Sequence, residues 1–150
     1  MTLQKHKEEI TTQSVLIGTV VRFLVKKDIH PNLISIFGCL TNMVTGAILA
    51  AGLFRLAVLA GFVANILDVF DGAVARVSGK QSRFGGFLDS VLDRISDAFI
   101  FGGICYWYFT SSNLIYGILT LLVLTTSFLI SYIRARAENE IPECRVGFCE

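Results

Sequence analysis

The sequence has little charge, little proline and almost no excess of charge of either sign. Only 17% of its 150 residues are charged and only 2 are proline, whereas about 25% of the residues of a soluble domain are charged. The formal net charge of +1 gives no basic surface of the kind that nucleic-acid-binding proteins need. Hydrophobic residues make up 53% of the chain. We therefore expect no nucleic-acid partner, and one domain that lies in a lipid bilayer.

Cysteine occurs without the spacing of a disulfide framework or a zinc site. No CxxC pair is present, and neither histidine lies near a cysteine. The first ten residues include Glu8 and Glu9 and lack the apolar core of a cleaved signal peptide. We expect four free thiols, two within apolar stretches and two in a C-terminal tail: Cys39, Cys105, Cys144 and Cys149.

Four apolar stretches, separated by short polar breaks, dominate the sequence. They cover residues 33–54, 56–67 with a less apolar continuation, 85–108 and 114–132. A helix of about 20 apolar residues crosses a hydrocarbon core of ~30 Å. The first and last stretches lack the polar stripe that a soluble helical bundle would show at a period of 3.6 residues. The sequence therefore predicts an all-α integral membrane protein with four transmembrane helices.

The N-terminal region has a different pattern. Residues 14–27 alternate apolar side chains with Arg22, Lys26 and Lys27, which predicts an amphipathic helix held on the membrane surface by anionic lipid. Pro31 ends this segment. We expect three parts: an N-terminus with the interfacial helix (1–31), a four-span membrane domain (32–137) and a tail (138–150).

Lysine and arginine mark one side of the expected membrane domain. They precede the first span, lie between the second and third, and follow the fourth, whereas the two opposite turns contain only Arg55. The positive-inside rule then places both termini and the loop at 76–84 in the cytoplasm. The expected location is the cell (inner or plasma) membrane.

Aspartates lie where a membrane helix should have none. An ionised side chain in a span costs at least ~2.5–3.5 kcal/mol, and such residues are usually functional. Asp68 and Asp71 are three residues apart and Asp89 and Asp93 are four apart, so each pair shares one helix face. The loop between the two spans would set the pairs at a similar depth. Asp97 is a fifth carboxylate, whose role the sequence leaves open.

Facing carboxylates require a counter-charge. Oxygen ligands without histidine or cysteine suit Mg²⁺ or Mn²⁺, and two such ions about 3.5–4 Å apart suit displacement at phosphorus. We expect two Mg²⁺ or Mn²⁺ ions, held by Asp68, Asp71, Asp89 and Asp93. The alternative is a polar contact between helices in which Arg76 or Arg94 neutralises the acids.

Small and basic residues surround the aspartates. Gly72 and Ala75 leave room for a bulky ligand, and Arg76 offers a planar fork for phosphate. Lys80 and Ser82 add donors, while Gly85 and Gly86 open the next helix, whose N-terminus favours an anion. Together they predict a pyrophosphate site at the membrane surface.

This arrangement resembles the signature of the CDP-alcohol phosphatidyltransferase family. All eight fixed residues are present, as Asp68-x2-Asp71-Gly72-x2-Ala75-Arg76-x8-Gly85-x3-Asp89-x3-Asp93. The resemblance implies transfer of a phosphatidyl-type group from a CDP-linked lipid to a small polar alcohol, with release of CMP. It also implies that Asp93 is the general base as well as a metal ligand. The nucleotide and donor would lie against Asn32, Gly72, Ala75, Arg76, Ser82 and Gly85.

The acceptor is less defined. Residues 131–138 (SYIRARAE) are similar to the subgroup that makes phosphatidylinositol phosphate or its archaeal ether-lipid counterpart. This implies inositol phosphate as the acceptor, bound by Arg134, Arg136 and Lys80; the alternative is that both arginines are interfacial anchors. Glycerol phosphate or another alcohol is the alternative acceptor. Because the family usually has six spans, we expect the tail at 138–150 to lead towards further spans.

Two other functions remain open. Intramembrane aspartates also occur along the ion paths of cation transporters, but these four gather at the cytoplasmic end. A non-catalytic membrane module is the other option, because the small residues Gly46, Ala50, Gly102 and Gly103 permit close helix packing. The same packing could support a homodimer.

Overall fold

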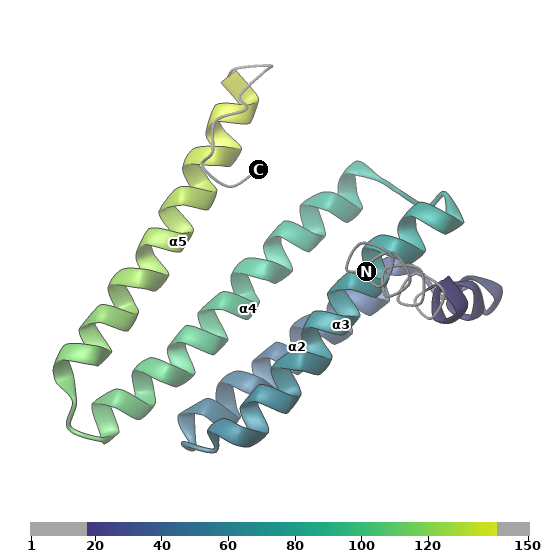
Figure 1. Cartoon of the computed structure of the whole chain (residues 1–150). Helices are drawn as coiled ribbons and strands as arrows, with labels where there is room; N and C mark the ends of the chain where they lie inside the picture. Colours follow the sequence, from purple (N-terminus) through teal and green to yellow (C-terminus); the bar gives the residue numbers. More distant parts are fainter. Residues whose placement is uncertain (1–17, 141–150) are drawn as a thin grey trace, which may run out of the picture.

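The computed structural model describes residues 18–140, with side chains through residue 137. A short helix at 18–26 precedes four long helices (Figure 1): α2 (Pro31–Ala50), α3 (Phe54–Ser78), α4 (Arg83–Thr110) and α5 (Leu114–Glu140). The described residues contain no strand. The expected all-α fold, with one N-terminal helix and four long ones, is confirmed. The expected helical residues 14–17, Cys144 and Cys149 lie outside the described residues.

Local sequence sets where the helices begin and end. Pro31 occupies the first turn of α2, where its missing N–H costs no hydrogen bond, and the Nδ1 atom of His30 accepts from the N–H of Asn32 at 3.3 Å. Gly52 and Gly79 have φ of 74° and 65°, a left-handed conformation that favours glycine. The turn at Gly52 ends α2 at Ala50, four residues before the expected end of the first span.

The helix α2 packs between α3 and α4 and contacts both. At its crossing with α4, a Cβ atom on Gly46 would overlap the carbonyl of Phe99. A Cβ on Gly103 would overlap the carbonyl of Gly46. The backbones of α2 and α4 therefore touch directly, as two rows of small residues permit. Gly46 and Gly103 thus pack within one chain.

The two carboxylate-bearing helices do not pack against each other. Among the described residues the long helices in contact are α2 with α3, α2 with α4, and α4 with α5 (Figure 1). The sequence suggested two neighbouring helices with facing acids, but α3 and α4 instead diverge over α2. The close approach that glycine allows between α2 and α4 explains this arrangement. It leaves a cleft with α2 at its base.

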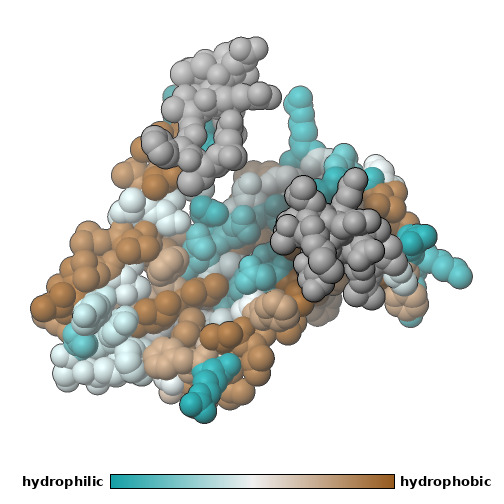
Figure 2. Space-filling view, in the orientation of Figure 1, coloured by the Kyte–Doolittle hydropathy of each residue, from teal (hydrophilic) through white to brown (hydrophobic). Residues whose placement is uncertain are grey.

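The exposed surface is that of a membrane protein. Three helices are long and apolar enough to cross a membrane: Pro31–Ala50, Phe54–Ser78 and Leu114–Ala137. Apolar residues cover most of the lower part of the face in Figure 2, and hydrophilic residues gather in its upper centre. The helix α4 carries five charged residues within its 28 and is not among the three. Its membrane crossing therefore stays a prediction.

The helix at 18–26 joins the bundle through one apolar face. Val21 is buried against Ile34 of α2 and Val74 of α3, while Arg22 and Lys26 are exposed on the other face. This is the amphipathic character expected from the sequence. The helix brings the segment that follows it to the end of the bundle where α3 stops and α4 starts (Figure 1).

Candidate functional site: a polar pocket between three helix ends

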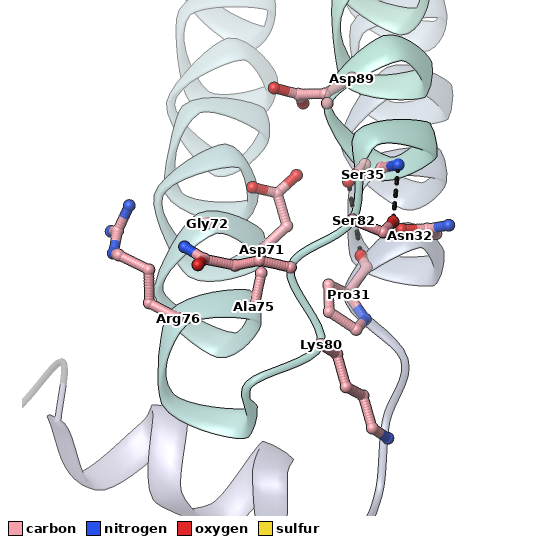
Figure 3. Close-up of a pocket in the computed structure, with 13 residues that line it drawn as sticks. Pro31, Asn32, Ser35, Asp71, Gly72, Ala75, Arg76, Lys80, Ser82 and Asp89 are labelled. Carbon is pink, nitrogen blue, oxygen red and sulfur yellow. Dashed lines mark hydrogen bonds between the residues drawn. The ribbon is translucent and has the colours of Figure 1, made fainter.

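A pocket of about 290 Å³ lies where α2 and α4 begin and α3 ends. Its base is the first turn of α2, and its two walls are α3 and α4 (Figure 3). The loop between α3 and α4 forms its rim. The lining residues are Pro31, Asn32, Ser35, Asp71, Gly72, Ala75, Arg76, Lys80, Gln81, Ser82, Gly85, Gly86 and Asp89.

Two helix N-termini meet at this pocket. Ser82 caps α4, because its Oγ accepts a hydrogen bond from the N–H of Gly85 at 2.9 Å. Gly85 also lies close to Asn32 of α2: a Cβ atom at Gly85 would be 3.5 Å from the Asn32 Oδ1. The dipoles of both helices favour an anion here. Asn32, Ser82 and Gly85, which we expect from the sequence to contact the nucleotide and donor, thus line one pocket.

Two of the four predicted metal ligands face each other across the pocket. Asp71 is on the α3 wall and Asp89 is on the α4 wall (Figure 3). Asp71 is only 7% exposed, and its Oδ2 atom is buried with no hydrogen-bond partner. A buried carboxylate oxygen without a partner is costly, so a cation or a donor group at this position would stabilise it.

The other two predicted ligands, Asp68 and Asp93, do not line the pocket. Asp68 lies over α2, where a Cβ atom on Gly38 would be 2.8 Å from its Oδ1. Charge repulsion nevertheless couples Asp68 to Asp71, Asp89 and Asp93. Within residues 18–137 no three histidine, cysteine, aspartate or glutamate side chains are close enough to hold a metal ion.

The donor set still fits a hard divalent cation. All four side chains are carboxylates, two of them, Asp71 and Asp89, line the pocket, and Asp71 has an oxygen that lacks a partner. A cation bound between the walls would offset the repulsion that acts across the cleft. A shared ion would require Asp71 and Asp89, on opposite walls of the pocket, to approach each other.

Arg76 lies at the outer side of α3 (Figure 3). Its guanidinium lies over Gly72, since a Cβ atom there would be 3.5 Å from the Arg76 Nη1. Both residues line the pocket together with Ala75. The predicted combination of small residues, Gly72 and Ala75, with the planar guanidinium of Arg76 is therefore present on the α3 wall (Figure 3).

The predicted acceptor residues are not together. Lys80 lies on the pocket rim, but its Nζ donates to the carboxylate of Asp28. Arg134 lines a separate cavity of about 640 Å³ between α4 and α5. Arg136 lies further along α5 and is exposed.

Arg94 and Asp97 connect α4 to α5. The Nη1 of Arg94 donates to the Ser131 Oγ at 2.7 Å, and its Nη2 lies 3.8 Å from Asp93 and 3.9 Å from Asp97. Asp97 accepts from the hydroxyl of Ser127 at 3.4 Å. Arg94 therefore balances part of the carboxylate charge on α4, and Asp97 faces α5 rather than the pocket.

Three lining residues were not predicted as site residues, Pro31, Ser35 and Gln81. Ser35 follows Asn32 by three residues, so it lies on the same helix face, and this spacing was a usable signal. Gln81 precedes the cap residue Ser82, and no pattern in the sequence marked it.

These observations define a class of protein: a helical membrane protein with a pocket at one end of its bundle, lined by carboxylates, basic residues and two helix N-termini. The sequence model of the CDP-alcohol phosphatidyltransferase family matches residues 28–147, which include all the helices that form the pocket. The chain belongs to this family.

Named relatives agree with this assignment. The chain is 46% identical over 110 residues to archaetidylinositol phosphate synthase of Methanothermobacter thermautotrophicus, which is 73% of this chain and 48% of that protein. It is 39% identical over 123 residues to phosphatidylinositol phosphate synthase of Mycobacterium marinum, covering 79% and 52%. The chain thus spans about half the length of these two synthases.

Solved structures show the same fold. The crystal structure of Mycobacterium tuberculosis phosphatidylinositol phosphate synthase with CDP-DAG bound matches with a TM-score of 0.81 and 32% identity, over 89% of this chain and 68% of that one. The same enzyme in complex with manganese and citrate matches with a TM-score of 0.77 and 31% identity, covering 89% and 65%.

Proposed function

We propose that this protein transfers a phosphatidyl-type group from a CDP-linked lipid to inositol phosphate and releases CMP. The observation that carries the proposal is the pocket in which Asp71 and Asp89 face each other beside Arg76 and two helix N-termini. This combination offers carboxylates for cations and positive groups for phosphates at one place. The CDP-DAG bound to the similar mycobacterial enzyme supports the donor.

Different residues of the pocket would bind different parts of the donor. The guanidinium of Arg76 and the N–H groups that begin α4 would bind the linked phosphates, as anions bind at helix N-termini. Gly72, Ala75 and Gly85 leave the space into which the CMP part fits. The aspartates would hold two Mg²⁺ or Mn²⁺ ions, which, when bound, supply positive charge to the phosphates and the departing CMP. The manganese in the related crystal structure supports this choice of cation.

Asp93 would act as the general base. It lies one helical turn along α4 from Asp89, about 6 Å further from the pocket rim. Its carboxylate would take the proton of the acceptor hydroxyl, whose oxygen then attacks the phosphorus of the phosphatidyl group. The bond between that phosphorus and the CMP oxygen breaks, and CMP leaves with the electron pair. Arg94, whose Nη2 lies 3.8 Å from Asp93, would offset part of the negative charge of this carboxylate.

Inositol phosphate is the proposed acceptor because two relatives are named as synthases of inositol phosphate lipids. Arg134 and Arg94 line the same cavity between α4 and α5, and a guanidinium there would bind the acceptor phosphate. The active pocket, both termini and the 76–84 loop would face the cytoplasm. A homodimer through an apolar helix face is compatible with this arrangement.

Release of CMP tests the proposed function. The 150-residue chain in lipid nanodiscs, given CDP-diacylglycerol, inositol phosphate and Mn²⁺, should release CMP, and removal of Mn²⁺ by a chelator should abolish release. In a panel of inositol phosphate, glycerol phosphate, serine and inositol, inositol phosphate should react fastest. No release with any acceptor would contradict the proposal, and preference for glycerol phosphate would correct the acceptor. Liposomes that pass Mn²⁺ but release no CMP would favour a transporter.

A further inference from the structure

One ion pair ties the pocket rim to the N-terminal segment. The Nζ of Lys80 lies 2.5 Å from the Oδ1 of Asp28, which is 52 residues earlier in the chain. Lys80 lines the pocket, but its side chain extends away from Asp71 and Asp89 in Figure 3. The charge of Lys80 is therefore directed to the outer side of the rim, towards Asp28.

The backbone position of Asp28 is fixed by its local conformation and by the helix that precedes it. It has a φ of 53°, a left-handed conformation that aspartate adopts more readily than most residues. Its N–H donates to the carbonyl of Val25 at 3.0 Å. The helix before it is anchored by Val21, which is buried against Ile34 and Val74. The position of Asp28 is thus set by α2 and α3 rather than by the loop that it contacts.

Lys80 is at the centre of a short loop between two helices. Gly79, with a φ of 65°, ends α3 directly before it, and Ser82, two residues after it, caps α4 through the N–H of Gly85. A restraint on Lys80 is therefore also a restraint on Gln81 and Ser82, which form the rim of the pocket.

We propose that Asp28 is a positioning residue that holds Lys80 and thereby fixes the loop at 79–82 over the anion-binding end of the pocket. The benefit to nucleotide binding rests on the proposed function, whereas the restraint on the loop does not. The hydrogen bond and the charge of Lys80 also hold the pKa of Asp28 below its ordinary value. Asp28 is therefore ionised, and the pair intact, at neutral pH.

Amide hydrogen exchange tests the restraint without any ligand. In the ligand-free chain in nanodiscs, Asp28→Asn keeps a residue that tolerates positive φ but removes the charge. Lys80→Met removes the partner charge and keeps an unbranched stem of similar length. Each substitution should raise the exchange rate of the amides at 80–86 by up to about fivefold, the size expected for an exposed ion pair. Lys80→Arg should keep the wild-type rate.

The double variant separates a shared interaction from two independent effects. If Asp28 acts through Lys80, the variant that combines Asp28→Asn with Lys80→Met exchanges no faster than either single variant. Lys27→Met is the matched control: it removes a nearby positive charge, which lies over the ring of Phe23, and should leave the loop unchanged. An unchanged rate in Asp28→Asn, or additive effects in the double variant, would overturn the proposal.

Binding of CMP then shows whether the restraint serves the pocket. With Mn²⁺ present, Asp28→Asn and Lys80→Met should weaken CMP binding by the same factor. If Lys80→Met weakens binding while Asp28→Asn leaves it unchanged or tightens it, Lys80 acts on the ligand directly and the positioning role is wrong. A wild-type chain that binds no CMP would contradict the proposed function, and hydrogen exchange would still decide the role of Asp28.

Discussion

Replacement of Asp93 by asparagine should reduce the turnover of CMP release by about a hundredfold to ten-thousandfold, the contribution of a general base. Asparagine has nearly the same shape as aspartate but cannot accept the acceptor's proton. The measurement is kcat for CMP release at saturating CDP-diacylglycerol and inositol phosphate.

Asp97→Asn is the matched control for this variant. Asp97 lies one turn further along the same helix, but it faces Ser127 of α5. We expect its turnover to stay within about twofold of wild type, as for substitutions away from a site. Equal losses in the two variants would show that Asp93 has no special role in proton transfer.

Replacement of Gly103 by alanine should strongly destabilise the bundle. The new Cβ atom would overlap the carbonyl of Gly46, which is backbone and cannot rotate aside. The helices α2 and α4 would have to separate, and the pocket that both help to form would distort with them. Overpacking of this kind costs about 1–3 kcal/mol of unfolding free energy and occasionally more. Thermal unfolding in detergent should therefore show a clearly lower midpoint.

The neighbouring Gly102 provides a control of the same chemistry. A Cβ atom at Gly102 meets nothing within 4 Å, so alanine there adds no clash. Because alanine has the higher helix propensity, Gly102→Ala should be neutral or stabilise by up to about 1 kcal/mol. If both variants unfold at the same temperature, the backbone contact between α2 and α4 does not determine stability.

Local patterns were sufficient to predict the helices and most of the pocket. Apolar runs separated by polar turns gave the four long helices, and the spacing from Asp68 to Asp93 placed residues of α3 and α4 at one end of the bundle. Residues three or four apart share a helix face, and the short loop between the two spans sets α3 and α4 at a common depth. The family resemblance supplied the residues expected to contact the nucleotide, among them Asn32.

The packing between helices could not be predicted in the same way. The divergence of α3 from α4 depends on the contact between Gly46 and Gly103, which are 57 positions apart and lie among several small residues. The pairing of Lys80 with Asp28, and the placement of Arg134 in a cavity with Arg94, likewise depend on how whole helices lie in space. Charge and residue type predicted an acceptor-binding role for Lys80 and Arg134, but did not predict that Lys80 pairs with Asp28 or that Arg134 lies in a cavity with Arg94.

The binding of Mn²⁺ tests most directly whether the carboxylates of α3 and α4 act together. Electron paramagnetic resonance on the wild-type chain in nanodiscs with CMP should detect two bound ions, magnetically coupled at a separation of about 4 Å. Asp71→Asn and Asp89→Asn, which alter opposite walls of the pocket, should each abolish the coupled signal. If Mn²⁺ binds with unchanged affinity when both residues are asparagine, the two helices do not share cations and the account is wrong.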